Sequence, residues 1–341
     1  MVDLAAIAAF GDTARPALRK ELEKVISRSG DNGTPELQQM ITYQLGWTGE
    51  NAGPKVEGKQ LRALFCLLAC QSAGGEWQQA LPAAAAVELI HNFSLIHDDI
   101  EDNGTLRRGR PTVWKIWGAA QAINTGDAMF ALANTALLGL AETVSPDAAL
   151  TAAELFHATC LRLTQGQHLD IAFEDQDEVD LKTYWLMVGG KTAALLAFSL
   201  ESGALSARVD PERQAKYRDF GHYLGMAFQV QDDILGIWGE EELTGKTITG
   251  DLVTRKKTLP VLFGLAQNRD FKRFWSAGEI KPENAPQLAE ILQAEGGRAY
   301  AQSAADRLTD LALKALDKAQ PVGEAGIILR ETAHQLLSRK D

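Results

Sequence analysis

Apolar residues recur at intervals of three and four along almost the whole chain, which is the spacing of one face of an α-helix. No segment shows the sustained alternation of apolar and polar residues that is typical of a half-buried strand. The pattern therefore predicts an all-α protein. The predicted helices cover about residues 4–27, 35–46, 59–72, 82–102, 119–142, 147–167, 179–203, 211–237, 258–267, 285–295, 297–317 and 323–338.

Residues that begin or interrupt helices support these boundaries. Pro82 stands in a first turn, and Ser145-Pro146 and Asp210-Pro211 each combine a capping side chain with a proline at the first helical position. Breaks fall at residues 29–34, 49–58, 72–75 and 239–255, and none is long or biased enough to be an interdomain linker. We therefore expect one helical domain spanning residues 1–341.

Composition narrows the classes of function. Lys and Arg number 34 against 45 Asp and Glu, and the net charge of −11 argues against a general nucleic-acid binder. No apolar run approaches the ~18 residues that span a bilayer, and the N-terminal residues do not resemble a signal peptide. We expect a cytoplasmic protein without a transmembrane segment. Cys66 and Cys70, one turn apart in an apolar run, are expected to be small core residues.

An acidic segment ends the predicted helix 82–102. Asp98 and Asp102 are four residues apart, so both carboxylates lie on one helical face, with His91 two turns earlier on that face. Like charges at this spacing repel, and a helix C-terminus disfavours anions, so the cluster favours a bound cation. Carboxylate oxygens suit Mg²⁺, which takes its other ligands from water and substrate phosphates.

Two other interpretations of this segment are weaker. A solvated acidic helix end is the common fate of a charge run, but three arginines follow at Arg107, Arg108 and Arg110, and guanidinium groups bind phosphates in a bidentate fork. A calcium loop starting at Asp98 would need a bidentate glutamate at its last position, where this chain has Gly109.

A second acidic face follows in the predicted helix 211–237. Gln229, Asp232, Asp233 and Gly236 share one face, and the flanking residues are apolar, so this face is expected to point into a cavity. Cations come soon after, at Lys246 and Lys256 with Lys257. Two acidic helix faces, each followed by cations, are uncommon in a protein with a purely structural role.

These segments resemble the trans-isoprenyl diphosphate synthases, or polyprenyl synthetases, over about residues 45–265. Asp98-Asp99-Ile100-Glu101-Asp102 with Arg107-Arg108-Gly109 is similar to the family's first aspartate-rich motif, and Phe228-Gln229 with Asp232-Asp233 to its second. Three further segments match in order: Gly58-Lys59-Gln60-Leu61-Arg62, Gly166-Gln167 with Asp170, and Gly190-Lys191-Thr192. The resemblance implies an all-α isoprenoid synthase bundle around a central cavity, and a homodimer.

The resemblance also implies an activity, the Mg²⁺-dependent head-to-tail transfer of the prenyl group of an allylic diphosphate onto isopentenyl diphosphate, with release of diphosphate. The implied metal ligands are Asp98, Asp99, Asp102, Asp232 and Asp233, with Asp98, Asp102 and Asp232 foremost. The implied allylic diphosphate site comprises Arg107, Lys191, Lys246 and Lys256, and the isopentenyl diphosphate site Lys59, Arg62, His91 and Arg108. Lys191, Thr192 and Gln229 would act in catalysis, the last two by facing the allylic cation.

The chain departs from the family pattern at three positions. Gly236 stands where the second motif usually has a third aspartate, Arg255 replaces a glycine before Lys256, and Glu57 replaces the first of two glycines before Lys59. Because the first carboxylate of the motif is expected to dominate, restoring an acid with Gly236→Asp is expected to change the metal dependence only modestly.

Three alternative functions remain open. A class I terpene cyclase would also use an aspartate-rich helix, but its second metal motif is missing after Asp232, and it would not need a second diphosphate site. A head-to-head prenyl synthase fits the motifs less well. An inactive regulatory subunit tends to lose motif acids, and only Gly236 suggests such a loss.

Product length depends on side chains one turn before the first motif. One helical turn rises about 5.4 Å, close to the length of an isoprene unit. Phe93, five residues before Asp98, would form a bulky floor, and Ser94 leaves room beside it. In the family, aromatic residues at both positions go with a C15 product, whereas one aromatic further down often goes with C20. Because only the first position is aromatic in this chain, we expect geranylgeranyl diphosphate, with farnesyl diphosphate or a longer product as alternatives.

Overall fold

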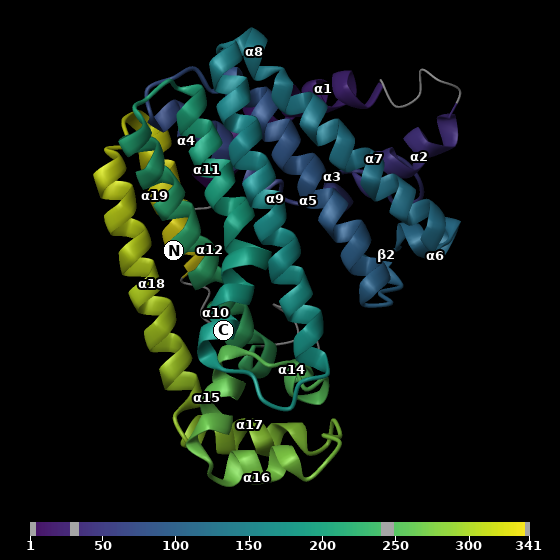
Figure 1. Cartoon of the computed structure of the whole chain (residues 1–341), viewed down its shortest axis with the longest axis vertical. Coiled ribbons are helices and arrows are strands. Elements are labelled where there is room, and N and C mark those ends of the chain that lie inside the picture. Colours follow the sequence, from purple (N-terminus) through teal and green to yellow (C-terminus); the bar gives the residue numbers. More distant parts are fainter. Residues whose placement is uncertain (1–4, 28–33, 240–248, 338–341) are drawn as a thin grey trace.

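The computed structural model describes residues 5–27, 34–239 and 249–337. The first half contains α1 (Ala5–Ile26), α2 (Pro35–Gln44), α3 (Pro54–Glu57), α4 (Leu61–Ser72), η2 (Trp77–Ala80), α5 (Leu81–Glu101), α6 (Val113–Trp117), α7 (Ala119–Leu138), α8 (Leu140–Thr143), α9 (Pro146–Glu174) and α10 (Leu181–Val188). The second half contains η3 (Gly189–Ala193), α11 (Ala194–Ser206), α12 (Pro211–Trp238), α14 (Gly250–Val253), α15 (Leu259–Gln267), α16 (Asp270–Ser276), α17 (Ala285–Ala294), α18 (Gly297–Ala319) and α19 (Gly323–Leu337). Strands β1 (Leu106–Arg107) and β2 (Arg110–Pro111) form a short hairpin (Figure 1).

The all-α prediction is confirmed, and the predicted helix starts hold. The side chains of Ser145 and Asp210 accept hydrogen bonds from the backbone N–H groups of Ala148 and Arg213, as N-caps do. The prediction was wrong at other places. Helix α9 continues to Glu174, the predicted helix 179–203 contains a π-helical turn at η3, and the hairpin and several short helices were not predicted.

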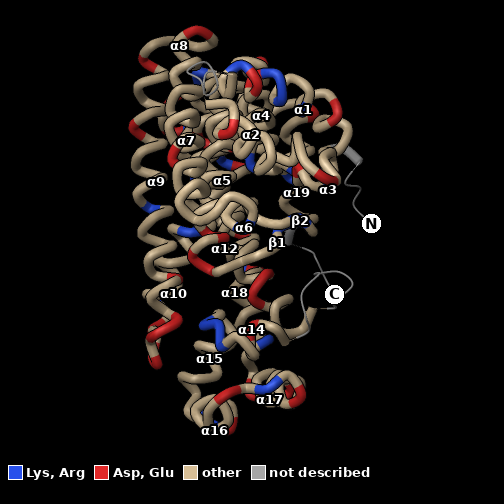
Figure 2. The backbone as a smooth tube through the Cα atoms, turned by 90° about the vertical axis from the view of Figure 1, so that its right-hand side faces the viewer, with Lys and Arg blue, Asp and Glu red and all other residues tan. Residues whose placement is uncertain are grey.

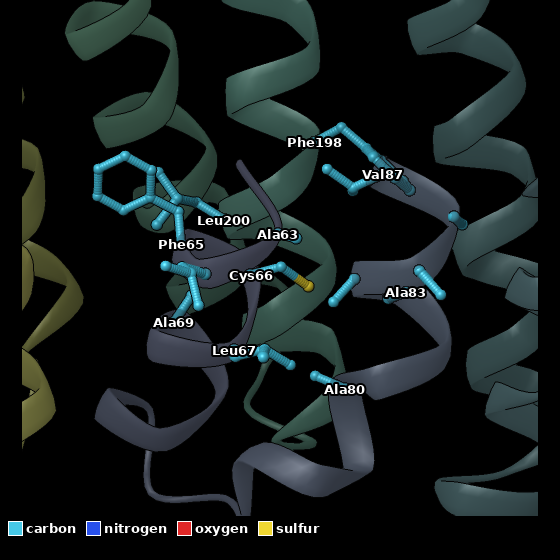
Figure 3. Packing of buried hydrophobic residues seen from close by; sticks show 14 of the residues in the cluster. Ala63, Phe65, Cys66, Leu67, Ala69, Ala80, Ala83, Val87, Phe198 and Leu200 are labelled. Atoms are coloured by element: carbon cyan, nitrogen blue, oxygen red, sulfur yellow. The ribbon is translucent and has the colours of Figure 1, made fainter. Parts of the chain in front are cut away.

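Helix α11 lies at the centre of the bundle, and every one of its residues from Ala194 to Ser206 is therefore buried. It packs against α4, α12, α9 and α5 (Figure 1). Small residues permit the close approach of α4: a Cβ atom on Gly203 would lie 2.1 Å from the carbonyl oxygen of Cys66. Cys66 and Cys70 are fully buried core residues, as predicted, and Figure 3 shows Cys66 among its apolar neighbours.

Helix α12 connects three groups of buried side chains. Its N-terminal part contributes Phe220 and Leu224 to the main core, its middle contributes Val230 to a second cluster, and Ile237 belongs to a third beside α16 and α17. One helix therefore contributes side chains to all three clusters. In the described ranges, no helix combines the length and apolar character needed to cross a bilayer.

Candidate active site

The first acidic segment lies at the C-terminal end of α5, where its three aspartates have different surroundings. Asp99 is buried, and Nε of Arg107 donates to its two carboxylate oxygens at 2.9 and 3.0 Å. Asp98 and Asp102 lie one turn apart, and burial and then the neighbouring charge of Asp98 raise the pKa of Asp102. The geometry therefore favours Asp98 and Asp102 as metal ligands. The metal role predicted for Asp99 does not fit, because its oxygens face Arg107.

The hairpin after α5 orients the arginines that the sequence singled out. Arg107 pairs with Arg110 across a two-residue turn, in which Arg108 and Gly109 both have positive φ, 52° and 73°. Such a turn matches the twist of the strands and favours glycine in this conformation. Arg107 consequently reaches Asp99 and Asp98, whereas Arg108 turns away and donates to the carbonyl oxygen of Val56 at 2.7 Å. One turn thus sends two adjacent guanidinium groups to two different places.

Two glycines bring Lys191 to the acidic end of α5. A Cβ atom on Gly166 of α9 would lie 2.1 Å from the backbone nitrogen of Lys191, and one on Gly190 would lie 2.5 Å from the carbonyl oxygen of Arg162. Helix α9 therefore touches the backbone of the π turn that carries Lys191 and Thr192. Such turns are frequent at functional sites because they re-aim side chains within a helix.

Lys191 and Gln167 join three helices at this point. The ammonium of Lys191 donates to Asp170 and lies 3.5 Å from Oδ1 of Asp98. Nε2 of Gln167 donates to Oδ1 of Asp98 at 3.3 Å and to Oε2 of Glu101 at 2.6 Å. Burial alone would lower the pKa of Lys191, but the carboxylates of Asp170 and Asp98 raise it above its usual value. Lys191 is therefore a fixed cation beside the first motif.

We expect Gly166→Ala to lower turnover about 100-fold, because the added methyl group must push α9 away from Lys191 and displacements of about 1 Å cost this much in catalysis. Steady-state kinetics of the purified variant would measure the loss. The matched control is Gly189→Ala in the same π turn, where the nearest atom to a new Cβ is 3.8 Å away, and which should keep wild-type turnover. Equal effects of the two substitutions would contradict the role given to the Gly166 contact.

The two aspartates of the second acidic segment also differ in their surroundings. Asp233 is buried, and its carboxylate accepts hydrogen bonds from the hydroxyl of Tyr184 at 2.7 Å, the N–H of Leu259 at 2.9 Å and the amide of Gln229 at 3.0 Å. Burial raises the pKa of Asp233 to about 6, although Lys256 and these donors oppose the shift. The metal role predicted for Asp233 does not fit a carboxylate enclosed by protein donors. Asp232, on the half-buried side of α12, remains the candidate.

Thr192 and Gln229, which were both predicted to face the allylic cation, are in contact with each other. The hydroxyl of Thr192 donates to Oε1 of Gln229 at 2.8 Å, which leaves the lone pairs of the Thr192 oxygen available. Thr192 lines the cavity described below, whereas Gln229 lies behind it and links it to Asp233. Of the two predicted oxygens, that of Thr192 is the one placed to face a substrate.

Of the two lysines predicted to bind diphosphate after the second motif, the structure describes Lys256. Burial alone would lower the pKa of Lys256, but the carboxylates of Asp251, Asp233, Asp170 and Asp232 raise it, so its charge lies among these acids. Arg255, which replaces a glycine of the family pattern, has a φ of 56°, the left-handed conformation that glycine adopts most readily. Lys246 lies outside the described residues.

A second basic cluster surrounds His91. Nη1 of Arg62 lies 3.4 Å from Nε2 of His91, and Arg108 packs against Gly58, where a Cβ atom would lie 2.6 Å from its Nη2. Loss of solvation, followed by the charges of Arg62, Arg108 and Arg107, lowers the pKa of His91 well below its usual value. Lys59 is exposed in the loop between α3 and α4. The structure therefore groups three of the four residues predicted for isopentenyl diphosphate.

Sequence reasoning missed one buried acid of this cluster, Glu88. It is 2% exposed, accepts a hydrogen bond from Nδ2 of Asn92 at 2.9 Å, and lies close enough to Arg62 and Arg108 to stabilise both charges. Burial raises the pKa of Glu88, and Asn92 and the two arginines oppose that rise. A lone acid in the otherwise apolar run 82–90 of the predicted helix 82–102 was the available signal.

A cavity of about 440 Å³ joins the polar groups to an apolar end. Asp98, Gln167, Lys191 and Thr192 line its polar part, and Arg62 and His91 also reach it. The apolar lining includes Phe93, Leu95, Leu163, Ile171 and Leu195, with Ser94 beside Phe93. Figure 2 shows acidic and basic segments together at mid-height, near α6, α12 and β1. The arrangement can hold a charged head group at one end and a hydrocarbon chain at the other.

The acids at the C-terminal end of α5 fit a divalent cation by the chemistry of their donors. Asp98 and Asp102 offer carboxylate oxygens one turn apart, and the raised pKa of Asp102 reflects, after burial, a repulsion from Asp98 that a cation would relieve. Within the described ranges, no three acidic, histidine or cysteine side chains already converge as a metal site. Mg²⁺ does not require such a cage, because it commonly completes its shell with water and substrate phosphates.

Comparison with known proteins identifies the family. A sequence model of the polyprenyl synthetases matches residues 51–294, which include every residue of the two polar clusters. The chain belongs to this family. It is 38% identical over 291 residues to (2E,6E)-farnesyl diphosphate synthase of Mycobacterium tuberculosis, which covers 83% of this chain and 80% of that enzyme. It is 39% identical over 267 residues to geranylgeranyl diphosphate synthase of the same organism, covering 77% and 75% of the two chains.

A solved structure confirms the fold of this polyprenyl synthetase. The crystal structure of a polyprenyl synthetase from Streptomyces coelicolor A3(2) superimposes with a TM-score of 0.86 at 33% identity, covering 98% of this chain and all of the other. The family and the isoprenoid synthase fold predicted from the motifs are therefore confirmed.

Proposed function

We propose that this polyprenyl synthetase is a short-chain trans-prenyltransferase that joins isopentenyl diphosphate head to tail to an allylic diphosphate, with Mg²⁺ as the metal. One observation carries the proposal: Arg107 and Arg108, adjacent in one hairpin, belong to two polar clusters, and Asp98 of the first cluster and Arg62 and His91 of the second line the same cavity with an apolar end. Arg107 lies among the acids of α5, and Arg108 lies with Arg62 and His91. Two anion sites suit a reaction of two diphosphates, whereas a terpene cyclase needs only one.

Each cluster has a distinct role in this proposal. Asp98, Asp102 and Asp232 would hold Mg²⁺, which, when bound, neutralises charge on the leaving diphosphate and so weakens the allylic C–O bond. Arg107, Lys191, Lys246 and Lys256 would bind the same diphosphate. Arg62, His91, Arg108 and Lys59 would bind the second diphosphate without metal. The oxygen of Thr192, whose proton is committed to Gln229, would face and stabilise positive charge on the allylic carbons.

The decisive experiment supplies isopentenyl diphosphate with dimethylallyl, geranyl or farnesyl diphosphate in turn, with Mg²⁺, and sizes the dephosphorylated products by chromatography. We expect longer prenyl products only when both substrates are present, and none after chelation with EDTA until Mg²⁺ is restored. Diphosphate release from the allylic substrate alone would instead indicate a cyclase. No turnover of either substrate would indicate an inactive regulatory subunit.

We also propose a homodimer, in keeping with the family. Exposed apolar side chains on neighbouring helices support it, namely Leu138 of α7 at 57% exposure and Leu150 and Leu161 of α9 at 65% and 60%. Size-exclusion chromatography with light scattering would measure the mass, and a monomer at micromolar concentration would contradict the proposal. The cytoplasmic location expected from the sequence stays a prediction.

A further inference from the structure

The second motif lacks its third acid, and another carboxylate occupies the vacated space. Gly236 lies one turn after Asp232 on α12. A Cβ atom built on Gly236 would lie 2.0 Å from Oδ2, 2.5 Å from Cγ and 3.1 Å from Oδ1 of Asp251. The nearest neighbours of this glycine are therefore the three carboxylate atoms of a single side chain from α14. Any side chain at position 236 would have to displace them.

Asp251 is held in this position by its surroundings. It is 9% exposed, its neighbour Leu252 is fully buried in the cluster beside α16 and α17, and its carbonyl oxygen accepts a hydrogen bond from the N–H of Lys256 at 2.8 Å. Asp251 also raises the pKa of Lys256 together with Asp232 and Asp170, which places its charge among the acids and cations of the candidate site.

Helix geometry relates the position of the Asp251 carboxylate to that of Asp232. Side chains at 232 and 236 are one turn apart on the same helical face, about 5–6 Å between Cβ atoms. A carboxylate that packs on the Cα of Gly236 therefore lies where an aspartate at 236 would project, beside Asp232.

We propose that Asp251 supplies, from α14, the carboxylate that the second motif lacks at Gly236, and that it supports metal binding at Asp232. This proposal rests on the proposed function, because that function supplies the diphosphate that the metal would bind. It changes the expectation drawn from sequence for Gly236→Asp. The new side chain would collide with Asp251 and place two carboxylates in one space, so it should impair the site instead of leaving it nearly unchanged.

The test measures the affinity of the full-length protein for Mn²⁺, alone and with inorganic diphosphate, by isothermal titration calorimetry. The variants are Asp251→Ala, Asp251→Asn, Gly236→Asp and the double variant Gly236→Asp/Asp251→Ala. Asp251→Asn keeps the shape of the side chain and removes its charge. The matched control is Gly250→Ala on the same short helix, where a new Cβ atom meets nothing within 4 Å. Thermal melting followed by circular dichroism verifies that each variant is folded.

We expect each single substitution at Asp251 or Gly236 to weaken Mn²⁺ binding about 10-fold or more, as loss of a supporting carboxylate does at metal sites. The double variant should recover most of the affinity, and Gly250→Ala should keep all of it. Unchanged Mn²⁺ affinity in folded Asp251→Asn, or a double variant no better than Asp251→Ala, would overturn the proposal. Failure of the proposed function is recognised separately, by wild-type protein that binds Mn²⁺ and diphosphate but forms no prenyl product.

Discussion

Asp98→Asn is expected to lower turnover at least about 100-fold while leaving the fold intact, because it removes a carboxylate that carries charge stabilisation in the transition state. The asparagine keeps the size of the side chain and an oxygen that can accept from Gln167. Stability should change little, because Asp98 repels Asp102 at the same time as it attracts Arg107 and Lys191. Steady-state kinetics and thermal melting measure the two quantities.

The control for this prediction is Glu290→Gln, which neutralises an exposed acid on α17 away from the cavity and should retain wild-type turnover. A loss of Mn²⁺ affinity in Asp98→Asn that accompanies the loss of turnover would support a metal ligand rather than a general electrostatic role. A folded Asp98→Asn protein with wild-type turnover would show that the metal assignment at α5 is wrong.

The sequence predicts what depends on a single helix. Periodicity locates the long helices, and the i, i+4 relation correctly places Asp98 and Asp102 on one face. The same relation does not separate Asp98 from Asp99 or Asp232 from Asp233, because the difference arises from partners on other elements. Arg107 reaches Asp99 from the hairpin, and Tyr184 and Leu259 enclose Asp233 from α10 and α15.

Contacts between different helices could not be predicted from the sequence, for a physical reason. The approach of Gly166 to Gly190, the burial of Glu88 beneath two arginines and the position of Asp251 at Gly236 all join residues far apart in the chain. Spacing along one helix carries no information about such distances. The motifs named Gly166 and Gly190 by resemblance, but only the structure shows that the missing side chains let two backbones touch.

Phe93→Ala is expected to shift the main product to longer prenyl chains. Phe93 lines the apolar part of the cavity five residues before Asp98, about 7.5 Å along the helix axis, so a chain growing from the acids along α5 meets its ring. The ring packs against His97 and Phe130, with centroid distances of 4.6 and 5.5 Å. Removing it opens space toward Phe130.

The reciprocal substitution, which adds an aromatic ring at Ser94, tests the same prediction about product length. Ser94 lines the cavity beside Phe93, and its hydroxyl donates to the carbonyl oxygen of His91 in its own helix, so Ser94→Phe should fill the space and shorten the product toward C15. The farnesyl and geranylgeranyl synthases of Mycobacterium tuberculosis match this chain about equally, so overall similarity does not decide between C15 and C20.

Chromatography of dephosphorylated products from saturating isopentenyl diphosphate measures both shifts. Phe274→Ala, at a phenylalanine on α16 that is 53% exposed, is the control and should leave the distribution unchanged. Because Phe93 is only half-buried, its loss should destabilise the protein by less than the ~3–5 kcal/mol of an enclosed phenylalanine. An active Phe93→Ala enzyme with the wild-type distribution would mean that the chain does not meet this ring, and the expectation of a C20 product would lose its structural basis.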